Sequence, residues 1–235
     1  MPENEVSPAA RTFQPLESAP ISTQLYHHLR GAIIRGELRP GQALSELEIA
    51  RQNSTSRQPV REAFIKLAEE HLLSIQPQRG TFVVRISVAD VLDARFVREA
   101  IELAVVQEAA LSSTLSTVKE LRHLIALQKS VGSGHNEDFL ALDEEFHRTI
   151  ALSVGRAHAW RVIEKIKAQM DRIRYLSLDD ATPLTLLIEQ HSRIVDGIEA
   201  GDPTAASAAM RTHLREITVS LPDIAARFPD IFAPE

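Results

Sequence analysis

Two helical patterns separated by only three residues, Asn53–Thr55, constrain the fold of this chain more than any other feature of its sequence. The first pattern opens with the capping box Ser45–Glu48, whose serine and glutamate satisfy backbone N–H groups at the helix start. The second begins at Ser56 and tolerates Pro59 in its first turn. Its buried stripe consists of Val60, Phe64 and Leu67. Two helices joined by so short a turn are typical of a helix-turn-helix unit.

The segments on either side of this pair complete a larger pattern. Apolar residues at helical spacing predict a preceding helix over residues 23–35. After His71 the apolar period changes to two, and residues 73–76 and 81–84 predict a small β-hairpin. The order helix, helix, helix, hairpin is that of a winged helix-turn-helix domain, which we expect over residues 21–85.

The chain changes character after Ser87, where the strand pattern disappears and helical spacing takes over. Thr182–Pro183 and Asp202–Pro203 mark helix starts, because each places a proline directly after an N-cap residue. Six helices are expected, at about residues 88–112, 117–131, 137–153, 158–177, 183–199 and 203–220. The fold class is therefore mainly α. The winged domain is followed by an all-α helical bundle over residues 86–220 and a C-terminal tail over residues 221–235.

The net charge of −6 hides a difference between the two halves of the chain. Residues 18–85 carry nine Lys or Arg and six Asp or Glu, whereas residues 86–235 carry sixteen and twenty-three, so only the first half suits a polyanion.

Residues 1–20 lack the basic and apolar regions of a signal peptide, and we expect a flexible tail there. No apolar run approaches the ~18 residues of a membrane span. With no cysteine for disulfides, a cytoplasmic protein is expected.

The helix that follows the short turn carries side chains that suit DNA. Arg57 and Arg61 share one face near its N-terminus, the part of a recognition helix that meets base edges in the major groove. An arginine there can hold O6 and N7 of one guanine, although either arginine alone could equally be a solvated surface charge. The first-turn N–H groups suit a phosphate, and a glycine at the hairpin tip allows close approach of the backbone. The expected DNA-contacting set is Ser56, Arg57, Gln58, Arg61, Arg79 and Gly80.

A second constellation lies in the helical half. On the expected helix 137–153, Asp143 and His147 fall one turn apart inside the apolar stripe, within an arc of about 100°. His191 and His213 lie on the inward faces of the last two helices. A single core histidine is usually structural, but an unpaired buried carboxylate is costly, so four such groups together predict a divalent cation. One Asp and three imidazoles suit zinc or nickel first and manganese or iron(II) next, and an octahedral ion would keep two positions for water or a ligand carboxylate.

Several stretches of the first half together match a known pattern. They are Gly36–Gly41, Leu44–Glu46, Ile49–Ala50, Ser56–Phe64, Leu67 and Arg79–Thr81. These stretches closely resemble the N-terminal domain of the GntR family of transcription regulators. The resemblance implies that Arg57 and Arg61 contact bases of a near-palindromic, double-stranded operator and that Gly80 approaches the DNA. His71 stands where the family usually has glycine, so it is expected to adopt a positive φ.

The second half has its own matching pieces, which are Arg98 with Glu102, Asp143–His147, Glu189–His191, Gly201–Pro203 and His213–Leu214. They resemble the FCD sensor domain of the FadR branch of that family, in its VanR-like form with six helices. The resemblance implies that the four predicted ligands hold a metal, that a small carboxylic acid is anchored over it, and that the chain forms a homodimer. Candidate partners of the anionic effector, each also suited to a surface ion pair, are Arg98, Arg156, Arg172 and Arg174.

The sequence therefore predicts a DNA-binding transcription regulator, with repression relieved when the effector binds. An enzyme is one alternative, because a metal site with open positions could polarise water. Against it, Glu144 and Glu145 project roughly 100° and 200° around the helix from Asp143, and no Gly-x-Ser-x-Gly motif occurs. A DNA-binding protein without an effector is the other alternative, and it would have no use for four inward-facing metal ligands.

Overall fold

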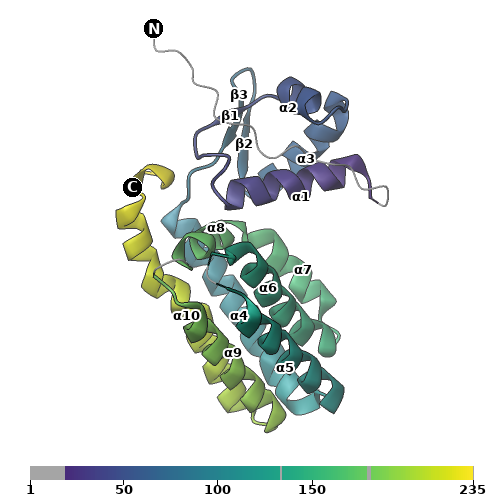
Figure 1. Cartoon of the computed structure of the whole chain (residues 1–235), viewed down its shortest axis with the longest axis vertical. Helices are drawn as coiled ribbons and strands as arrows, with labels where there is room; N and C mark the ends of the chain where they lie inside the picture. The colour runs from purple at the N-terminus through teal and green to yellow at the C-terminus, as the bar shows by residue number, and fades with distance from the viewer. Residues whose placement is uncertain (1–18, 133, 179–180, 235) are drawn as a thin grey trace. The chain divides into compact units, whose positions relative to one another are not determined.

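A computed structural model describes residues 19–132, 134–178 and 181–234 of the chain (Figure 1). These residues form two compact units that divide between Arg85 and Ile86, and each unit buries an apolar core of its own. No helix among them combines the length and the apolar character that crossing a membrane requires.

The N-terminal unit contains three helices and a small antiparallel sheet. Its elements are α1 (Ile21–Ile34), β1 (Ala43–Leu44), α2 (Glu46–Gln52), α3 (Arg57–Glu69), β2 (Leu73–Gln76) and β3 (Gly80–Val83). Strand β3 lies in the middle of the sheet, with β1 on one side and β2 on the other. This is the expected winged helix-turn-helix. The sequence does not predict β1, because two residues are too few to show an alternating pattern.

Local chemistry explains the short connections of this unit. The Ser45 side chain accepts a hydrogen bond from the backbone N–H of Glu48, as the predicted capping box requires at the start of α2. Leu29, Phe64 and Leu67 are buried where α1 packs against α3. His71, which follows α3, has a φ of 56°, the positive value predicted for it.

The C-terminal unit is a helical bundle. Its elements are α4 (Val88–Ser112), α5 (Leu115–Ser130), α6 (Asn136–Ser153), α7 (Ala157–Ile166), α8 (Ala168–Ser177), α9 (Leu184–Glu199), α10 (Pro203–Arg227) and the 3-10 turn η1 (Pro229–Ile231). Helix α10 packs along α4 and α9, and α5 packs along α6 and α9 (Figure 1). The core between them contains Phe139, Phe146 and Ile150, all from α6.

The prediction of a single helix over residues 158–177 is wrong, because the helix is interrupted at Lys167 and two helices, α7 and α8, take its place. The described part of this unit therefore has seven α-helices where six were expected. Lys167 is buried, and its Nζ atom lies 3.0 Å from Glu144 of α6 and 2.7 Å from Asp171 of α8. This ion pairing joins different helices, so the apolar spacing of a single segment does not reveal it.

The expected irregular tail over residues 221–235 is also wrong. Helix α10 runs through Pro222 to Arg227, and the chain then pairs with the start of the unit through a bridge between Ile86 and Phe232. Leu221 and Ile224 are buried in the same apolar cluster as Ile86 and Phe232. Burial of these side chains offsets the backbone hydrogen bond that a proline removes from a helix interior.

Candidate metal centre and nucleic-acid interface

The structure brings the four predicted metal ligands together in the core of the helical bundle. Asp143 and His147 come from α6, His191 from α9 and His213 from α10. All four are buried, and each offers one ligand atom within 4.8 Å of the others. The Nε2 atom of His213 lies 3.0 Å from that of His147 and 3.3 Å from that of His191. The three imidazoles therefore turn the same nitrogen towards one point.

The outward nitrogens of the three imidazoles face hydrogen-bond acceptors. Nδ1 of His147 contacts a carboxylate oxygen of Glu102. Nδ1 of His191 lies 2.8 Å from Oε1 of Gln128, and Nδ1 of His213 lies 3.1 Å from Oε1 of Gln190.

Both glutamine amides have a fixed orientation. Their Nε2 groups donate to the Leu142 carbonyl, at 3.3 Å, and to Glu216, at 2.9 Å, so their oxygens must face the imidazoles. Each Nδ1 is thus the protonated nitrogen, and each Nε2 presents a lone pair to the centre. Three converging lone pairs repel one another unless a cation lies between them, and a carboxylate or amide behind each ligand is typical of metal-bound histidine.

Electrostatics favours the metal-binding protonation states. Burial lowers the pKa of His191 and takes that of His213 well below its usual value, so both rings stay neutral at pH 7. Burial alone would raise the pKa of Asp143, but the positive charge of Arg174 holds it well below its usual range. Burial likewise opposes the charged form of Glu102, yet Arg98 and His147 lower its pKa to about 2. The centre therefore presents the neutral imidazoles of His191 and His213 and an ionised carboxylate.

The Asp143 carboxylate tests whether these residues fit a metal. Arg174 approaches its Oδ1 atom at 2.5 Å, but neither Asp143 oxygen makes a hydrogen bond of normal geometry within the described residues. A buried acceptor in that condition is costly unless another positive partner is present. The donor set, one carboxylate and three imidazoles, suits a divalent transition metal, and the residues fit such an ion.

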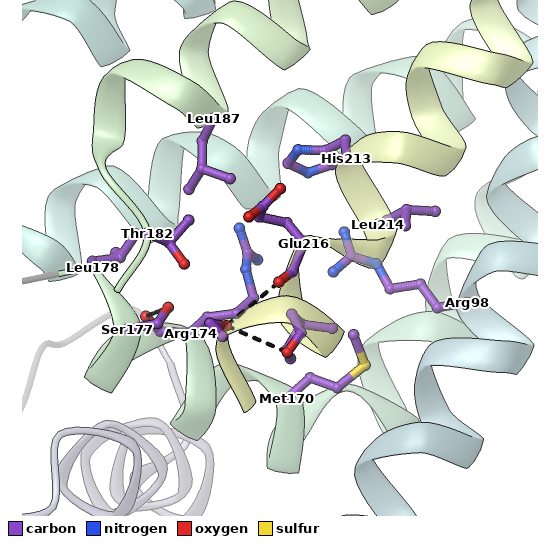
Figure 2. A pocket seen from close by; sticks show the side chains of 12 residues that line it. Arg98, Met170, Arg174, Ser177, Leu178, Thr182, Leu187, His213, Leu214 and Glu216 are labelled. Atoms are coloured by element: carbon purple, nitrogen blue, oxygen red, sulfur yellow. Dashed lines mark hydrogen bonds between the residues drawn. The ribbon is translucent and has the colours of Figure 1, made fainter. Parts of the chain in front are cut away.

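A cavity lies beside this centre, and two of the four predicted effector arginines line it. Arg98 and Arg174 line it, together with the metal-ligand candidate His213 (Figure 2). Arg156 does not: it is exposed and paired with Glu108 at 2.8 Å, which corrects its assignment to the effector site. Arg172 is buried next to Gln169, 3.1 Å away, and also does not line the cavity.

Sequence reasoning missed four polar residues that also line the cavity, among them Thr182 and Glu216. Glu216 lies on α10, one helical turn after His213, and Thr182 lies between α8 and α9. The signal available was the spacing of His213 and Glu216, three residues apart and therefore on neighbouring positions of one helix surface.

All six residues predicted to contact DNA are exposed in the N-terminal unit. Ser56 is the N-cap of α3, but its side chain makes no capping hydrogen bond, so the first-turn N–H groups stay available to an anion. Gly80 begins β3 with a φ of 115°, a conformation that favours glycine. Gln58 donates to Glu62 at 3.1 Å, within α3.

The two predicted base-reading arginines share one carboxylate, a contact that the sequence does not predict. Glu46, at the start of α2, lies 2.8 Å from Nη2 of Arg57 and 3.0 Å from Nε of Arg61. A hydrogen bond from Arg61 is the main cause that lowers the pKa of Glu46, which therefore stays ionised at neutral pH. Glu46 thus holds both guanidinium groups on the exposed side of α3.

Both units match known protein families. Residues 21–83 match the family model for bacterial regulatory proteins of the gntR family, and residues 93–216 match the model for the FCD domain.

Two curated relatives match over most of their length. The HTH-type transcriptional repressor RspR of Escherichia coli is 40% identical over 92% of this chain and 95% of its own. The probable D-xylose utilization operon transcriptional repressor of Paenarthrobacter nicotinovorans is 30% identical over 86% and 89%. Among solved structures, E. coli McbR/YncC has a similar fold, with a TM-score of 0.74, 22% identity and coverage of 87% of this chain and 99% of that chain.

Proposed function

The chain belongs to the GntR family of bacterial transcription regulators and carries an FCD domain, and from that premise we propose that it represses genes under the control of a small carboxylic acid. It is a DNA-binding regulator with a C-terminal effector-binding domain rather than an enzyme. We assign operator binding to residues 21–85 and effector sensing to residues 86–220. Binding chromosomal DNA would place it in the cytoplasm.

For the sensor, we propose that Asp143, His147, His191 and His213 hold a divalent transition metal, zinc or nickel in first place and manganese or iron in second. The observation that carries this proposal is the acceptor behind each Nδ1 atom, which leaves three Nε2 lone pairs and one carboxylate directed at the same point. When bound, the metal supplies a Lewis acid that attracts a carboxylate.

The cavity beside the centre is the proposed effector site. Arg98 and Arg174 line it and supply positive charge for an anionic ligand. Both guanidinium groups already pair with carboxylates, Arg98 with Glu102 and Arg174 with Asp143. An effector that contacts Arg174 therefore competes with Asp143 for it, which couples effector binding to the metal centre.

For DNA, we propose that Arg57 and Arg61 read guanines in the major groove, while Ser56, Gln58, Arg79 and Gly80 contact the backbone or approach it. Two such modules in a dimer would bind the two halves of a near-palindromic operator. The effector binds the DNA-bound and the free arrangements of the dimer with different affinities. This difference sets how much the effector changes the affinity for DNA.

The proposed homodimer uses an exposed apolar face of the helical unit. Leu92 and Phe96 lie one turn apart on α4 with 39% and 67% of their surface exposed. Val219 of α10 is 71% exposed. Arg215, one turn before Val219, contacts Glu99 of α4 at 2.7 Å, so these residues lie on the same side of the unit. Exposed apolar residues grouped in this way favour a protein interface.

The test combines operator selection with a ligand screen. Duplexes that bind the metal-containing full-length protein are selected from a random library, and their affinity is measured by fluorescence anisotropy with and without small carboxylic acids. We expect a two-fold symmetric site and an acid that weakens binding by about 5- to 150-fold, the usual range of allosteric coupling. Binding without sequence preference would exclude an operator-specific regulator.

A further inference from the structure

The effector cavity has a polar wall that a simple carboxylate does not need. Three hydroxyl-bearing residues line it: Ser177, Thr182 and Ser220. Ser177 donates to the Arg174 carbonyl at 3.0 Å (Figure 2), and Ser220 donates to the Ile217 carbonyl at 3.3 Å. Thr182 differs from both serines. It is only 3% exposed, and its Oγ1 atom has no hydrogen-bond partner among the described residues.

Glu216 also lines this cavity, and its carboxylate carries the opposite charge to the two arginines. Figure 2 shows its side chain extending from α10 into the space that Thr182, Arg174 and His213 surround. Gln190 donates to Oε2 of Glu216 at 2.9 Å and accepts from Nδ1 of His213 at 3.1 Å. The Glu216 carboxylate is therefore fixed in position by a chain of hydrogen bonds that begins at the metal centre.

These two residues restrict the chemistry of the ligand. A carboxylate group suits Arg98 and Arg174, but a second negative charge near Glu216 would be repelled. A purely apolar tail would leave the Thr182 hydroxyl buried without a partner and would strip water from Glu216 with no compensation. The part of the ligand that meets this wall must therefore donate hydrogen bonds.

A hydroxyl group meets both requirements. It donates to the Glu216 carboxylate and accepts from the Thr182 hydroxyl, which is both donor and acceptor. An ammonium group also donates to Glu216, but it accepts nothing from Thr182 and would be placed in a cavity that two guanidinium groups already line.

We propose that Thr182 and Glu216 select a hydroxylated carboxylic acid, with the hydroxyl bound between them and the carboxylate held on the side of Arg98 and Arg174. The proposal rests on the proposed effector site, and it narrows the ligand class of that site. Thr182 and Glu216 become its specificity-determining residues.

The test uses acids of matched skeleton that differ in one group. Dissociation constants are measured by titration calorimetry on the metal-containing full-length protein, for lactate, propionate and alanine and for malate, succinate and aspartate. Gluconate and hexanoate extend the comparison to a longer chain. We expect at least one hydroxy acid to bind about tenfold or more tightly than its hydroxyl-free counterpart, because a hydrogen bond to a charged acceptor discriminates by at least that much.

Variants then assign the preference to the two residues. Thr182→Val replaces the hydroxyl by a methyl group of the same shape, and Glu216→Leu removes the acceptor. Each is expected to reduce the preference for the hydroxy acid to about threefold or less. Thr182→Val should bind propionate or succinate as before. Glu216→Leu also removes a negative charge and the acceptor of Gln190, so it is judged by the ratio of the two affinities. The matched control is Glu189→Gln, because Glu189 is an exposed residue of α9 that pairs with Arg193 outside the cavity.

The possible failures are distinguishable. Equal binding of hydroxylated and hydroxyl-free acids by the wild-type protein would overturn the selection of a hydroxyl and leave the effector site standing. A preference for alanine or aspartate would also overturn it, in favour of an ammonium group at Glu216. If none of these acids binds, both this inference and the proposed carboxylic-acid effector are overturned. The wild-type comparison holds even if a variant fails to fold.

Discussion

The Oε1 atom of Gln128 lies 2.8 Å from Nδ1 of His191, and this contact decides which imidazole nitrogen faces the metal centre. Gln128 is fully buried on α5, and its Nε2 group donates to the Leu142 carbonyl, so the amide cannot turn without losing both bonds. The residue thus belongs to the centre although it offers no ligand atom to it.

Replacing Gln128 by leucine should weaken metal binding while leaving all four ligands in place. We expect a loss of about 10- to 100-fold in metal affinity, the usual effect of removing a group that orients a ligand. The measurement is competition with a chelator of known affinity. Gln107→Leu is the control, because Gln107 is an exposed glutamine of α4. Unchanged affinity in the Gln128 variant would remove this residue from the account of the centre.

Replacing a ligand itself should abolish metal binding. We expect about one transition metal ion per wild-type chain and almost none in His213→Ala, measured by elemental mass spectrometry on protein prepared without an affinity tag. His123→Ala, at an exposed position of α5, should retain the wild-type content. Stoichiometric metal in the His213 variant would show that this residue is not a ligand.

Replacing Arg61 by alanine should cost ~1–3 kcal/mol of binding free energy on the selected operator and relax the base preference at one position. The reason is the loss of a two-point contact to guanine. Lys66→Ala removes the same charge from the last turn of α3 and serves as the control. Equal losses on the operator and on random DNA in the Arg61 variant would argue for phosphate contact instead of base reading.

Replacing Glu46 by glutamine should free Arg57 and Arg61 from their shared carboxylate. We expect tighter binding to random DNA, because two exposed guanidinium groups are no longer neutralised in part, and a smaller ratio of operator to random affinity. Anisotropy titrations over a range of salt concentrations measure both. The control is Glu48→Gln, two residues further along α2, which removes the same charge without touching either arginine pair. If the ratio of operator affinity to random-DNA affinity falls in both variants, the effect comes from the change in net charge and not from the pairing of Glu46 with the arginines.

Replacing Phe96 by glutamate should dissociate the proposed dimer, because a charge would then lie in the apolar face of α4. Sedimentation velocity at micromolar concentration should report a monomer for this variant and a dimer for the wild-type protein. Leu111→Glu is the control on the same helix, at a position that is 73% exposed. A dimer that persists in Phe96→Glu would place the interface elsewhere.

Much of the fold and of the site could be predicted from the sequence because it depends on local spacing. The capping box at Ser45 and the short turn before Ser56 determine the helix-turn-helix, and they act over a few residues. Asp143 and His147 are one turn apart in an apolar stripe, so their burial follows from helix geometry alone.

Tertiary structure alone decided which residues support those sites. Gln128 meets His191 across 63 positions of sequence, and Glu46 meets Arg61 across 15, so no pattern along one helix indicates either contact. The break at Lys167 and the extension of α10 to Arg227 have the same origin, since each depends on what another segment offers for pairing or burial. Periodicity specifies which face of a helix is buried, but the partner of each buried group is set only when the helices pack.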